Sequence, residues 1–224
     1  MTMWSNASPL TEAIDSIARA VLAIVRTHPV RVLIDGRSAA GKTTFSNALA
    51  RRLVAVGKEV VVAEFDEFHP NGYRSRGGSW SYTPERYLED GFDFAAFQKM
   101  VMTPAASGGS RLVTLSLEDP SRQAVLPPDG ILLVDGSFLA KPSLRASWDF
   151  VIWLDVSFES MVERAVARDV AWVHDEAKVR RHYQTFWRDV HALYESLGPR
   201  ETADAIVDNE DASRPRLTKL RPSR

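Results

Sequence analysis

Hydrophobic residues along the chain change between helical spacing and short unbroken runs. Residues 10–26 carry apolar side chains three and four positions apart, which predicts an amphipathic helix. The apolar run 30–35 ends at a glycine and predicts a buried strand. Helical spacing returns at 42–56, where Gly57 predicts the end of a helix, and a second apolar run follows at 59–65. A strand, a crossover helix and a second strand within about 35 residues predict a βαβ unit with parallel strands.

The rest of the chain continues this alternation. Apolar runs at 131–135, 150–156 and 205–207 predict three further buried strands, and the alternating residues at 111–117 predict a strand in a small antiparallel insertion. Residues 71–84 are rich in Gly, Ser, Arg and aromatic residues and predict an ordered or closing surface loop. We therefore expect an α/β fold, with a parallel sheet and helices on both of its faces. The remaining helices are expected at 92–101, 158–168 and about 175–197.

Composition limits the class of protein. The chain has 224 residues, a length typical of one domain, and its 45% hydrophobic and 25% charged residues are those of a globular protein with a buried core. The net charge of -1 provides no long-range field for nucleic acid or an anionic membrane, so we expect neither partner. The absence of cysteine excludes disulfides, thiolate metal sites and a cysteine nucleophile. A homo-oligomer stays an open alternative to a monomer.

The N-terminal region predicts the compartment. The apolar stretch 17–25 is interrupted by Arg19 and is about half as long as a membrane-spanning helix. The first ten residues lack the basic start and apolar centre of an export signal. We therefore expect a cytoplasmic protein, and the lack of cysteine fits a reducing compartment.

One motif indicates phosphate binding. Residues 36–43, G-R-S-A-A-G-K-T, match the phosphate-binding loop (P-loop) G-x-x-x-x-G-K-[ST] without a mismatch, between a predicted strand and a predicted helix. Glycines let successive N–H groups point at phosphate oxygens, and the helix N-terminus adds positive potential. We expect Lys42 to bridge the outer phosphates of a nucleoside triphosphate such as ATP, Thr43 to bind Mg²⁺, and Thr44 to support the helix start. The predicted nucleotide-binding residues are Gly36, Ser38, Ala39, Ala40, Gly41, Lys42, Thr43 and Thr44.

Two aspartates stand at the ends of predicted strands, where ligands of open parallel sheets bind. Asp135 follows four apolar residues and is a candidate for holding Mg²⁺ with its water shell, with a strand-end turn as the alternative. Asp66 is a candidate base that accepts a proton from an attacking hydroxyl, with a helix cap as the alternative. We expect Glu67 and His69 to support this segment rather than to react.

Four arginines, Arg164, Arg168, Arg180 and Arg181, lie around the junction of two predicted helices. The first two are four residues apart and therefore share a helix face. Cations that close over phosphates stabilise the transferring charge and exclude water. The alternative for these four residues is a set of scattered, solvated arginines. For Arg74 and Arg76 in the surface loop, the two alternatives are contact with the substrate and a solubilising role.

With these residues placed, the chain resembles the uridine kinase and phosphoribulokinase group of P-loop kinases, and most of all its uridine-kinase-like members. The resemblance covers residues 30–209, nearly the whole chain, and the order and spacing of its segments make it specific. The segments that carry it are I-D-G-R-S-A-A-G-K-T-T at 34–44, F-D-E-F-H at 65–69, D-G-F-D-F at 90–94, I-L-L-V-D-G-S-F-L at 131–139, E-R-A-V-A-R-D at 163–169 and A-D-A-I-V-D-N at 203–209.

The resemblance implies transfer of the γ-phosphate of Mg·ATP to a hydroxyl of a small molecule, foremost a nucleoside such as uridine or cytidine. It implies catalytic roles for Lys42, Asp66, Arg164 and Arg168, with Asp66 as the base and the two arginines in a helical lid. It further implies a kinase domain over 1–210, with a lid at about 164–182 and a substrate loop at about 67–90. Residues 211–224 are expected to form a loose basic tail.

Two departures from the family pattern concern the acceptor. Tyr87 stands where uridine kinases have an acid that holds the ribose hydroxyls, and V-A-W-V-H at 170–174 replaces the R-G-R of their lid. Other acceptors therefore stay open: nicotinamide riboside, dephospho-coenzyme A, a sugar or a vitamin-like alcohol. The alternative outside enzymes is a nucleotide-dependent regulatory module without an acceptor.

Overall fold

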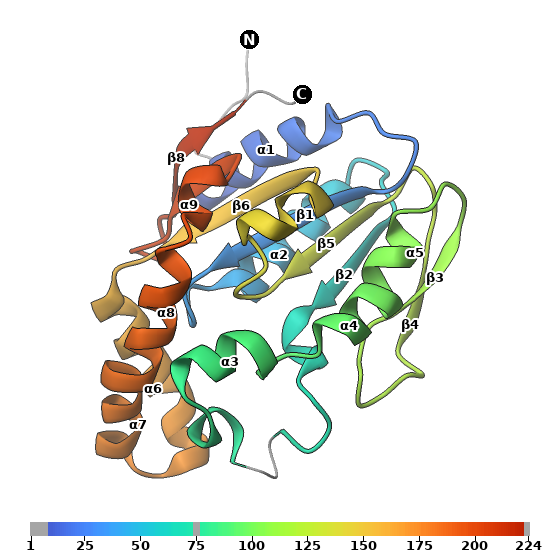
Figure 1. The fold of residues 1–224 in the computed structure, drawn as a ribbon. Coiled ribbons are helices and arrows are strands. Elements are labelled where there is room, and N and C mark those ends of the chain that lie inside the picture. The colour runs from blue at the N-terminus through green and yellow to red at the C-terminus, as the bar shows by residue number, and fades with distance from the viewer. Residues whose placement is uncertain (1–8, 74–76, 222–224) are drawn as a thin grey trace.

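The structure, a computed structural model, describes residues 9–73 and 77–221. Its centre is a six-stranded sheet in the order β2-β5-β1-β6-β7-β8, whose first five strands are parallel while β8 is antiparallel to β7. Figure 1 shows that the carboxyl ends of the parallel strands point toward the side of the molecule that carries α6, α7 and α8. The strands are β1 (Val30–Gly36), β2 (Val60–Glu64), β5 (Ile131–Asp135), β6 (Phe150–Asp155), β7 (Ala205–Asp208) and β8 (Arg216–Leu220).

The central strands are apolar because both faces of the sheet are covered. All five residues of β5 are buried, and β1 pairs with β5 on one side and with β6 on the other. Parallel strands buried on both faces consist of unbroken apolar runs, which is the pattern that predicted them. The predicted α/β fold with a parallel sheet is confirmed.

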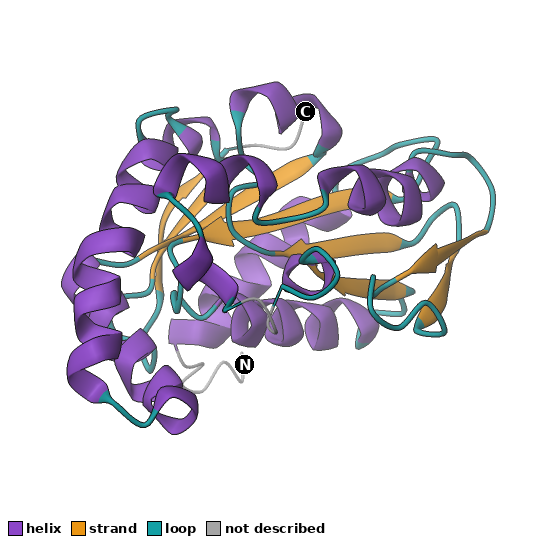
Figure 2. Ribbon diagram, turned by 60° about the horizontal axis from the view of Figure 1, so that its bottom comes forward, coloured by secondary structure: helices purple, strands orange, loops and turns teal. Residues whose placement is uncertain are grey.

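Helices cover both faces of the sheet, as Figure 2 shows. The α1 helix buries the face that its apolar spacing predicted and packs against α2. The helices are α1 (Pro9–Leu22), α2 (Lys42–Val54), α3 (Pro84–Asp90), α4 (Phe94–Phe97), α5 (Thr103–Ala105), α6 (Phe158–Val173), α7 (Glu176–His182), α8 (Arg188–Glu195) and α9 (Pro199–Thr202). The 3-10 turns are η1 (Phe65–Phe68), η2 (Gly78–Ser81) and η4 (Pro142–Ser147), and the π-helical turns are η3 (Gln98–Met102) and η5 (Tyr183–Trp187).

Local details differ from the sequence predictions. The helix expected over 175–197 consists of α7, the π-helical turn η5 and α8, which follow one another without a break. The α3 helix was not predicted, because seven residues are too few to show a helical period, although Thr83 caps it and Pro84 begins it. The predicted strand at 111–117 is shorter, and as β3 (Arg111–Thr114) it pairs antiparallel with β4 (Gln123–Leu126) in the expected small insertion.

The prediction of a loose tail over 211–224 is wrong for residues 216–220. These residues form β8, which extends the sheet at its β7 edge and continues the domain beyond residue 210. The side chains of β8 alternate between exposed and half-buried positions. Its basic residues and the nearby proline concealed this alternation, yet charged residues are common on edge strands because they prevent further pairing.

Within the described residues, none of the helices has the length and apolar character that a membrane crossing requires.

Candidate active site

The P-loop joins β1 to α2 in a conformation that needs its glycines. Gly36 has φ 152°, and a Cβ there would stand 2.5 Å from the carbonyl oxygen of Leu154 on β6. Gly41 has φ 90° and precedes the first turn of α2, where a side chain would meet the amide of Asn209. That amide donates a hydrogen bond of 2.7 Å to the carbonyl oxygen of Ala40. The loop is thus held in a curl around the N-terminus of α2, a geometry that binds phosphate.

A buried carboxylate anchors the start of the loop. Asp35 is fully buried, and its Oδ2 accepts hydrogen bonds from the backbone N–H groups of Leu139 and Ala140, at 2.9 and 2.8 Å. The hydroxyl of Tyr194 on α8 donates to the same oxygen at 2.6 Å. Asp35 therefore ties β1 both to the segment after β5 and to α8. The sequence predicts no role for this residue, because its partners lie about 100 and 160 residues away along the chain.

Helix α8 also contacts the loop itself. Arg37 forms a two-pronged ion pair with Glu195, with both N···O distances at 2.7 Å. His191 is 2% exposed, and its Nε2 accepts a hydrogen bond of 3.2 Å from the N–H of Ser38 and lies 3.1 Å from the Ser38 hydroxyl. Burial, together with the nearby positive charges of Lys42 and Arg37, lowers the pKa of His191 to about 3. A neutral imidazole is therefore an acceptor that holds Ser38 in place.

We expect replacement of His191 by leucine to lower the free energy of unfolding by about 1 to 3 kcal/mol, because the Ser38 N–H loses its acceptor. Glutamine, whose side-chain oxygen can take the place of Nε2, should restore most of this loss. The unfolded chain protonates His191 at about pH 6.5, well above the folded pKa, so its contribution is present at neutral pH and is lost as the pH falls from about 6.5 toward 3.

Urea unfolding of the wild type, His191→Leu and His191→Gln between about pH 4.5 and 8 measures both effects. His191→Gln should weaken the loss of stability at acid pH, since this variant has one group fewer that takes up a proton on unfolding. Equal stability of the leucine variant and the wild type at neutral pH would contradict the assigned hydrogen bond.

Lys42 lies at the first residue of α2 and bends back over the loop. Its Nζ donates to the carbonyl oxygens of Arg37 and Gly36, at 2.9 and 3.3 Å. Burial lowers the pKa of Lys42, while the negative charges of Asp66, Asp35 and Asp135 act in the opposite direction. The ammonium group is therefore held among carboxylates and carbonyl oxygens, at the place where a phosphate would add further negative charge.

Thr43 and Asp135 form a pair beside Lys42. The Thr43 hydroxyl donates to Oδ2 of Asp135 at 2.6 Å, and Asp135 is 4% exposed. Its other oxygen, Oδ1, is buried and has no hydrogen-bond partner among the described residues. A hydroxyl and a buried carboxylate with an unused oxygen fit Mg²⁺, which binds through one or two side chains and takes its other ligands from phosphate and water. The described residues contain no group of three or more His, Cys, Asp or Glu side chains able to hold a metal by themselves.

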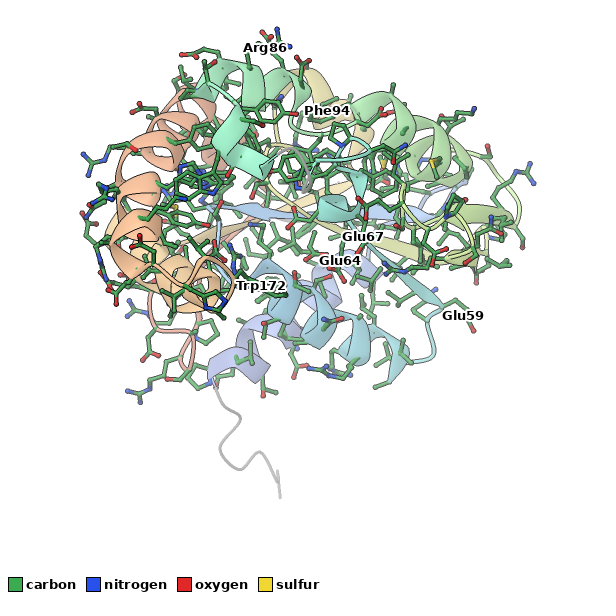
Figure 3. All side chains as sticks on the ribbon, turned by 90° about the horizontal axis from the view of Figure 1, so that it is seen from below. Glu59, Glu64, Glu67, Arg86, Phe94 and Trp172 are labelled. Atoms are coloured by element: carbon green, nitrogen blue, oxygen red, sulfur yellow. The ribbon has the colours of Figure 1, made fainter. Side chains whose placement is uncertain are left out.

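Two cavities meet at this place. The phosphate cavity, of about 310 Å³, is lined by residues of the P-loop and by Glu64, Asp135 and Arg164. The aromatic cavity, of about 610 Å³, lies on the other side and extends to α6, α7 and η5. Figure 3 labels Glu64 at the end of β2, on the phosphate side, and Trp172 near the end of α6, on the aromatic side. The residues that line both cavities are Ala39, Lys42, Asp66 and Arg168.

Asp66 lies in η1, directly after β2, and is exposed to both cavities. It does not cap a helix, since the residue before the first residue of η1 is Glu64. Among the neighbouring charges, that of the Asp66 carboxylate has the largest effect on the pKa of Lys42, which it raises. The same charge raises the pKa of Arg168. The predicted base and the predicted cations are thus brought together, whereas Glu67 turns away and pairs with Arg122 at 2.9 Å.

The four arginines separate into two groups. Arg168 lines both cavities, and Arg164 lines the phosphate cavity while donating to the carbonyl oxygens of Asn209 and Glu210, at 2.9 and 2.7 Å. Arg180 pairs with Glu163 and Glu176 at the surface, and Arg181 is exposed, so neither lines a cavity. The alternative of solvated arginines therefore holds for this second pair. Arg74 and Arg76 lie outside the described residues.

The aromatic cavity was not predicted. The ring of His69 stacks between Tyr73 and Phe92, with centroid distances of 3.8 and 4.2 Å. In the same cavity the ring of His182 stacks on Trp80, with a centroid distance of 3.7 Å, and burial lowers the pKa of His182 to about 4. These side chains come from segments far apart in the sequence, and the available signal was the number of aromatic residues at 73–87 and 172–187. The remaining aromatic lining residues are Tyr87, Phe138, Trp172, Tyr183 and Trp187.

Comparison with known proteins shows the fold. Searches with family sequence models and among curated proteins found no match. A possible uridine kinase from Bacillus stearothermophilus is similar in structure, with a TM-score of 0.63 and 19% identity over 88% of this chain and 98% of that one. A protein from Silicibacter sp. TM1040, provisionally described as a fructose transport system kinase, has a TM-score of 0.63 and 22% identity over 82% and 94%. D-glycerate 3-kinase from Cryptococcus neoformans has a TM-score of 0.53 and 9% identity over 86% and 89%. The chain therefore has the fold of uridine-kinase-like P-loop kinases.

Proposed function

We propose that this protein is an ATP-dependent small-molecule kinase that transfers the γ-phosphoryl group of ATP to a hydroxyl of a nucleoside-like acceptor. The observation that carries the proposal is the junction of the two cavities at Lys42, Asp66 and Arg168. One cavity has the donors that hold a polyphosphate, and the other can hold a small molecule. A base and two cations stand where their ligands would meet, which is the arrangement that phosphoryl transfer requires.

The chemistry follows from these positions. The acceptor hydroxyl, placed beside Asp66, gives its proton to the carboxylate while its oxygen forms a bond to the γ-phosphorus. The bond between that phosphorus and the oxygen bridging to the β-phosphate breaks, and ADP leaves with the electron pair. Lys42 and Arg168 stabilise the charge on the phosphate oxygens, and N–H groups of the P-loop hold the β-phosphate. Thr43 and Asp135 would hold Mg²⁺, which when bound neutralises part of the phosphate charge.

The lining of the aromatic cavity supports an uncharged, ring-bearing acceptor. Its cationic side chains, Lys42 and Arg168, stand at the junction with the phosphate cavity. His182, which lines the aromatic cavity alone, is neutral at pH 7 because burial lowers its pKa to about 4. The Lys178 ammonium lies over the Trp80 ring, 4.9 Å from its centre, but Lys178 does not line the cavity. An anionic acceptor would therefore meet no cationic lining side chain among the described residues away from the reacting phosphate. Aromatic walls bind planar rings by stacking. A nucleoside fits this lining better than a sugar, an anionic alcohol or dephospho-coenzyme A.

The test is ADP production from Mg·ATP in the presence of nucleosides, sugars and vitamin alcohols, with Lys42→Ala as the blank. Nucleosides should raise the rate at least about 10-fold above the acceptor-free rate, because an oriented hydroxyl reacts faster than water. A rate that only sugars or acids raise would contradict the acceptor assignment. Slow hydrolysis that no acceptor changes, together with tight ATP binding, would favour the regulatory module instead.

A further inference from the structure

Hydrogen bonds hold the guanidinium group of Arg168 along the edge formed by Nε and Nη2. Nε donates to Oδ1 of Asp169 at 2.6 Å, and Nη2 donates to Oδ2 of the same carboxylate at 3.2 Å. Nη2 also donates to the hydroxyl of Tyr183 at 3.1 Å. Within residues 9–73 and 77–221, the two N–H groups of Nη1 have no hydrogen-bond partner. Nη1 is therefore the nitrogen whose donors are open to a ligand.

Asp169 and Tyr183 are also joined to each other, so that the three side chains form a closed network. The Tyr183 hydroxyl donates to Oδ2 of Asp169 at 2.7 Å while it accepts from Arg168. Arg168 and Asp169 belong to α6, and Tyr183 is the first residue of η5, which packs against α6. Tyr183 is 3% exposed, and its ring stacks on that of Trp187 with a centroid distance of 5.8 Å. Its hydroxyl is therefore a fixed point to which the other two side chains are attached.

The network lies at the junction of the two cavities. Arg168 lines both cavities, whereas Asp169 and Tyr183 line the aromatic cavity and not the phosphate cavity. The edge of the guanidinium group that is already held thus belongs to the aromatic side. The donors of Nη1 are left for phosphate oxygens, which arginine binds with several N–H groups at once.

The network also keeps Arg168 apart from Asp66. The hydrogen bond with Asp169 raises the pKa of Arg168 most, and the charge of Asp66 adds a smaller increase. In the part of the chain that the structure describes, Arg168 forms an ion pair with Asp169 and none with Asp66. A guanidinium group released from Asp169 would be attracted to Asp66 and would occupy the carboxylate that is proposed to take the proton.

We propose that Asp169 and Tyr183 are positioning residues: they hold Arg168 so that its Nη1 meets the transferred phosphoryl group and its charge does not block the base. The inference rests on the proposed function. It assigns to both residues a role that acts through Arg168 rather than through contact with either substrate. A cation held in this way needs little rearrangement as negative charge develops, so loss of the network should lower kcat.

The first experiment is a double-mutant cycle on kcat, measured as acceptor-dependent ADP release at saturating Mg·ATP and acceptor. We expect Asp169→Asn to lower kcat by about 10-fold or more, and Tyr183→Phe to lower it by about 3- to 10-fold. In an Arg168→Ala background, each of these changes should alter kcat by less than about 2-fold, because the residue that they position is gone.

Glu163→Gln is the matched control for this cycle. Glu163 is also a carboxylate of α6 that pairs with an arginine, Arg180, but neither residue lines the phosphate or the aromatic cavity, so kcat should stay within about 2-fold of the wild type. Wild-type kcat in both Asp169→Asn and Tyr183→Phe would overturn the inference. Equal losses with and without Arg168 would overturn it too, because the residues would then act independently of that arginine. A higher acceptor KM at unchanged kcat would instead show that Asp169 binds the acceptor itself.

The second experiment applies the same cycle to nucleotide binding and needs no turnover. Calorimetry measures the dissociation constants of ADP and of a non-hydrolysable ATP analogue. Because Arg168 stands where the outer phosphate would lie, Asp169→Asn and Tyr183→Phe should weaken binding of the analogue by about 3-fold or more and that of ADP by less than about 2-fold. Both effects should vanish in the Arg168→Ala protein, and unchanged ADP binding shows that each variant is folded.

The two experiments separate failure of the inference from failure of the proposed function. If no acceptor makes the wild type release ADP, the proposed function is wrong, and the binding cycle decides the inference alone. Equal affinity of the wild type and both variants for the ATP analogue would then overturn the inference, as would a weakening that persists in the Arg168→Ala protein.

Discussion

Replacing Lys42 by alanine is expected to lower the rate of phosphoryl transfer by about 10³-fold. Lys42 lines both cavities, and its ammonium group is surrounded by the carbonyl oxygens of Gly36 and Arg37 and by the charge of Asp66. A cation fixed in this way needs little rearrangement when negative charge develops on the transferred group, and such preorganised groups dominate electrostatic catalysis. Its loss removes stabilisation that is largest in the transition state, so kcat should fall more than the affinity for ATP.

The measurement is acceptor-dependent ADP release at saturating Mg·ATP, together with binding of a non-hydrolysable ATP analogue. Lys99→Ala is the matched control, because Lys99 is exposed on η3 and lines neither cavity, and its rate should equal that of the wild type. A Lys42→Ala rate above about one tenth of the wild-type rate would contradict the placement of the reacting phosphate at the junction of the two cavities.

The part of the site that could be predicted from the sequence consists of features that are local in the chain. The P-loop is one continuous segment, and Asp66 and Asp135 each follow an apolar run, so a pattern of about ten residues places them. Parallel pairing then brings the ends of β2, β5 and β1 to one edge of the sheet. This topology rule is the reason that three separate segments could be assigned to one site.

The part that could not be predicted depends on contacts between distant segments. Tyr194 belongs to the apolar face of the helix predicted at about 175–197, and the sequence predicts no role for His191. Only packing shows that these residues hold Asp35 and Ser38. The aromatic cavity likewise combines η2, α6 and η5, whose relative positions no periodicity describes. A π-helical turn such as η5 leaves little trace in the sequence, although such turns are frequent at functional sites.

Replacing Asp66 by asparagine is expected to reduce kcat by about 10² to 10⁴-fold and to change ATP affinity by only a few-fold. Asparagine has the shape of aspartate, but its amide cannot accept the proton of the acceptor hydroxyl. The position of Asp66 in both cavities makes it the described carboxylate that can reach this proton, since Asp169 is held by Arg168 and Tyr183. The neighbouring Glu67→Gln is the control, because Glu67 pairs with Arg122 and lines neither cavity.

Asp66→Asn has a second possible cause of lost activity, namely loss of the positive charge of Lys42. The pH dependence of the rate separates this cause from loss of the base. The charge of Asp66 raises the pKa of Lys42, which burial lowers, so Asp66→Asn should lower the Lys42 pKa further and favour its uncharged form at high pH. A deficit of this origin shrinks as the pH falls, because Lys42 regains its proton, whereas a deficit from the missing base persists at every pH. Rates of Asp66→Asn measured between about pH 6 and 9 distinguish the two causes. Recovery to the wild-type rate at the acid end would show that Asp66 acts through the charge of Lys42 and does not take the proton itself.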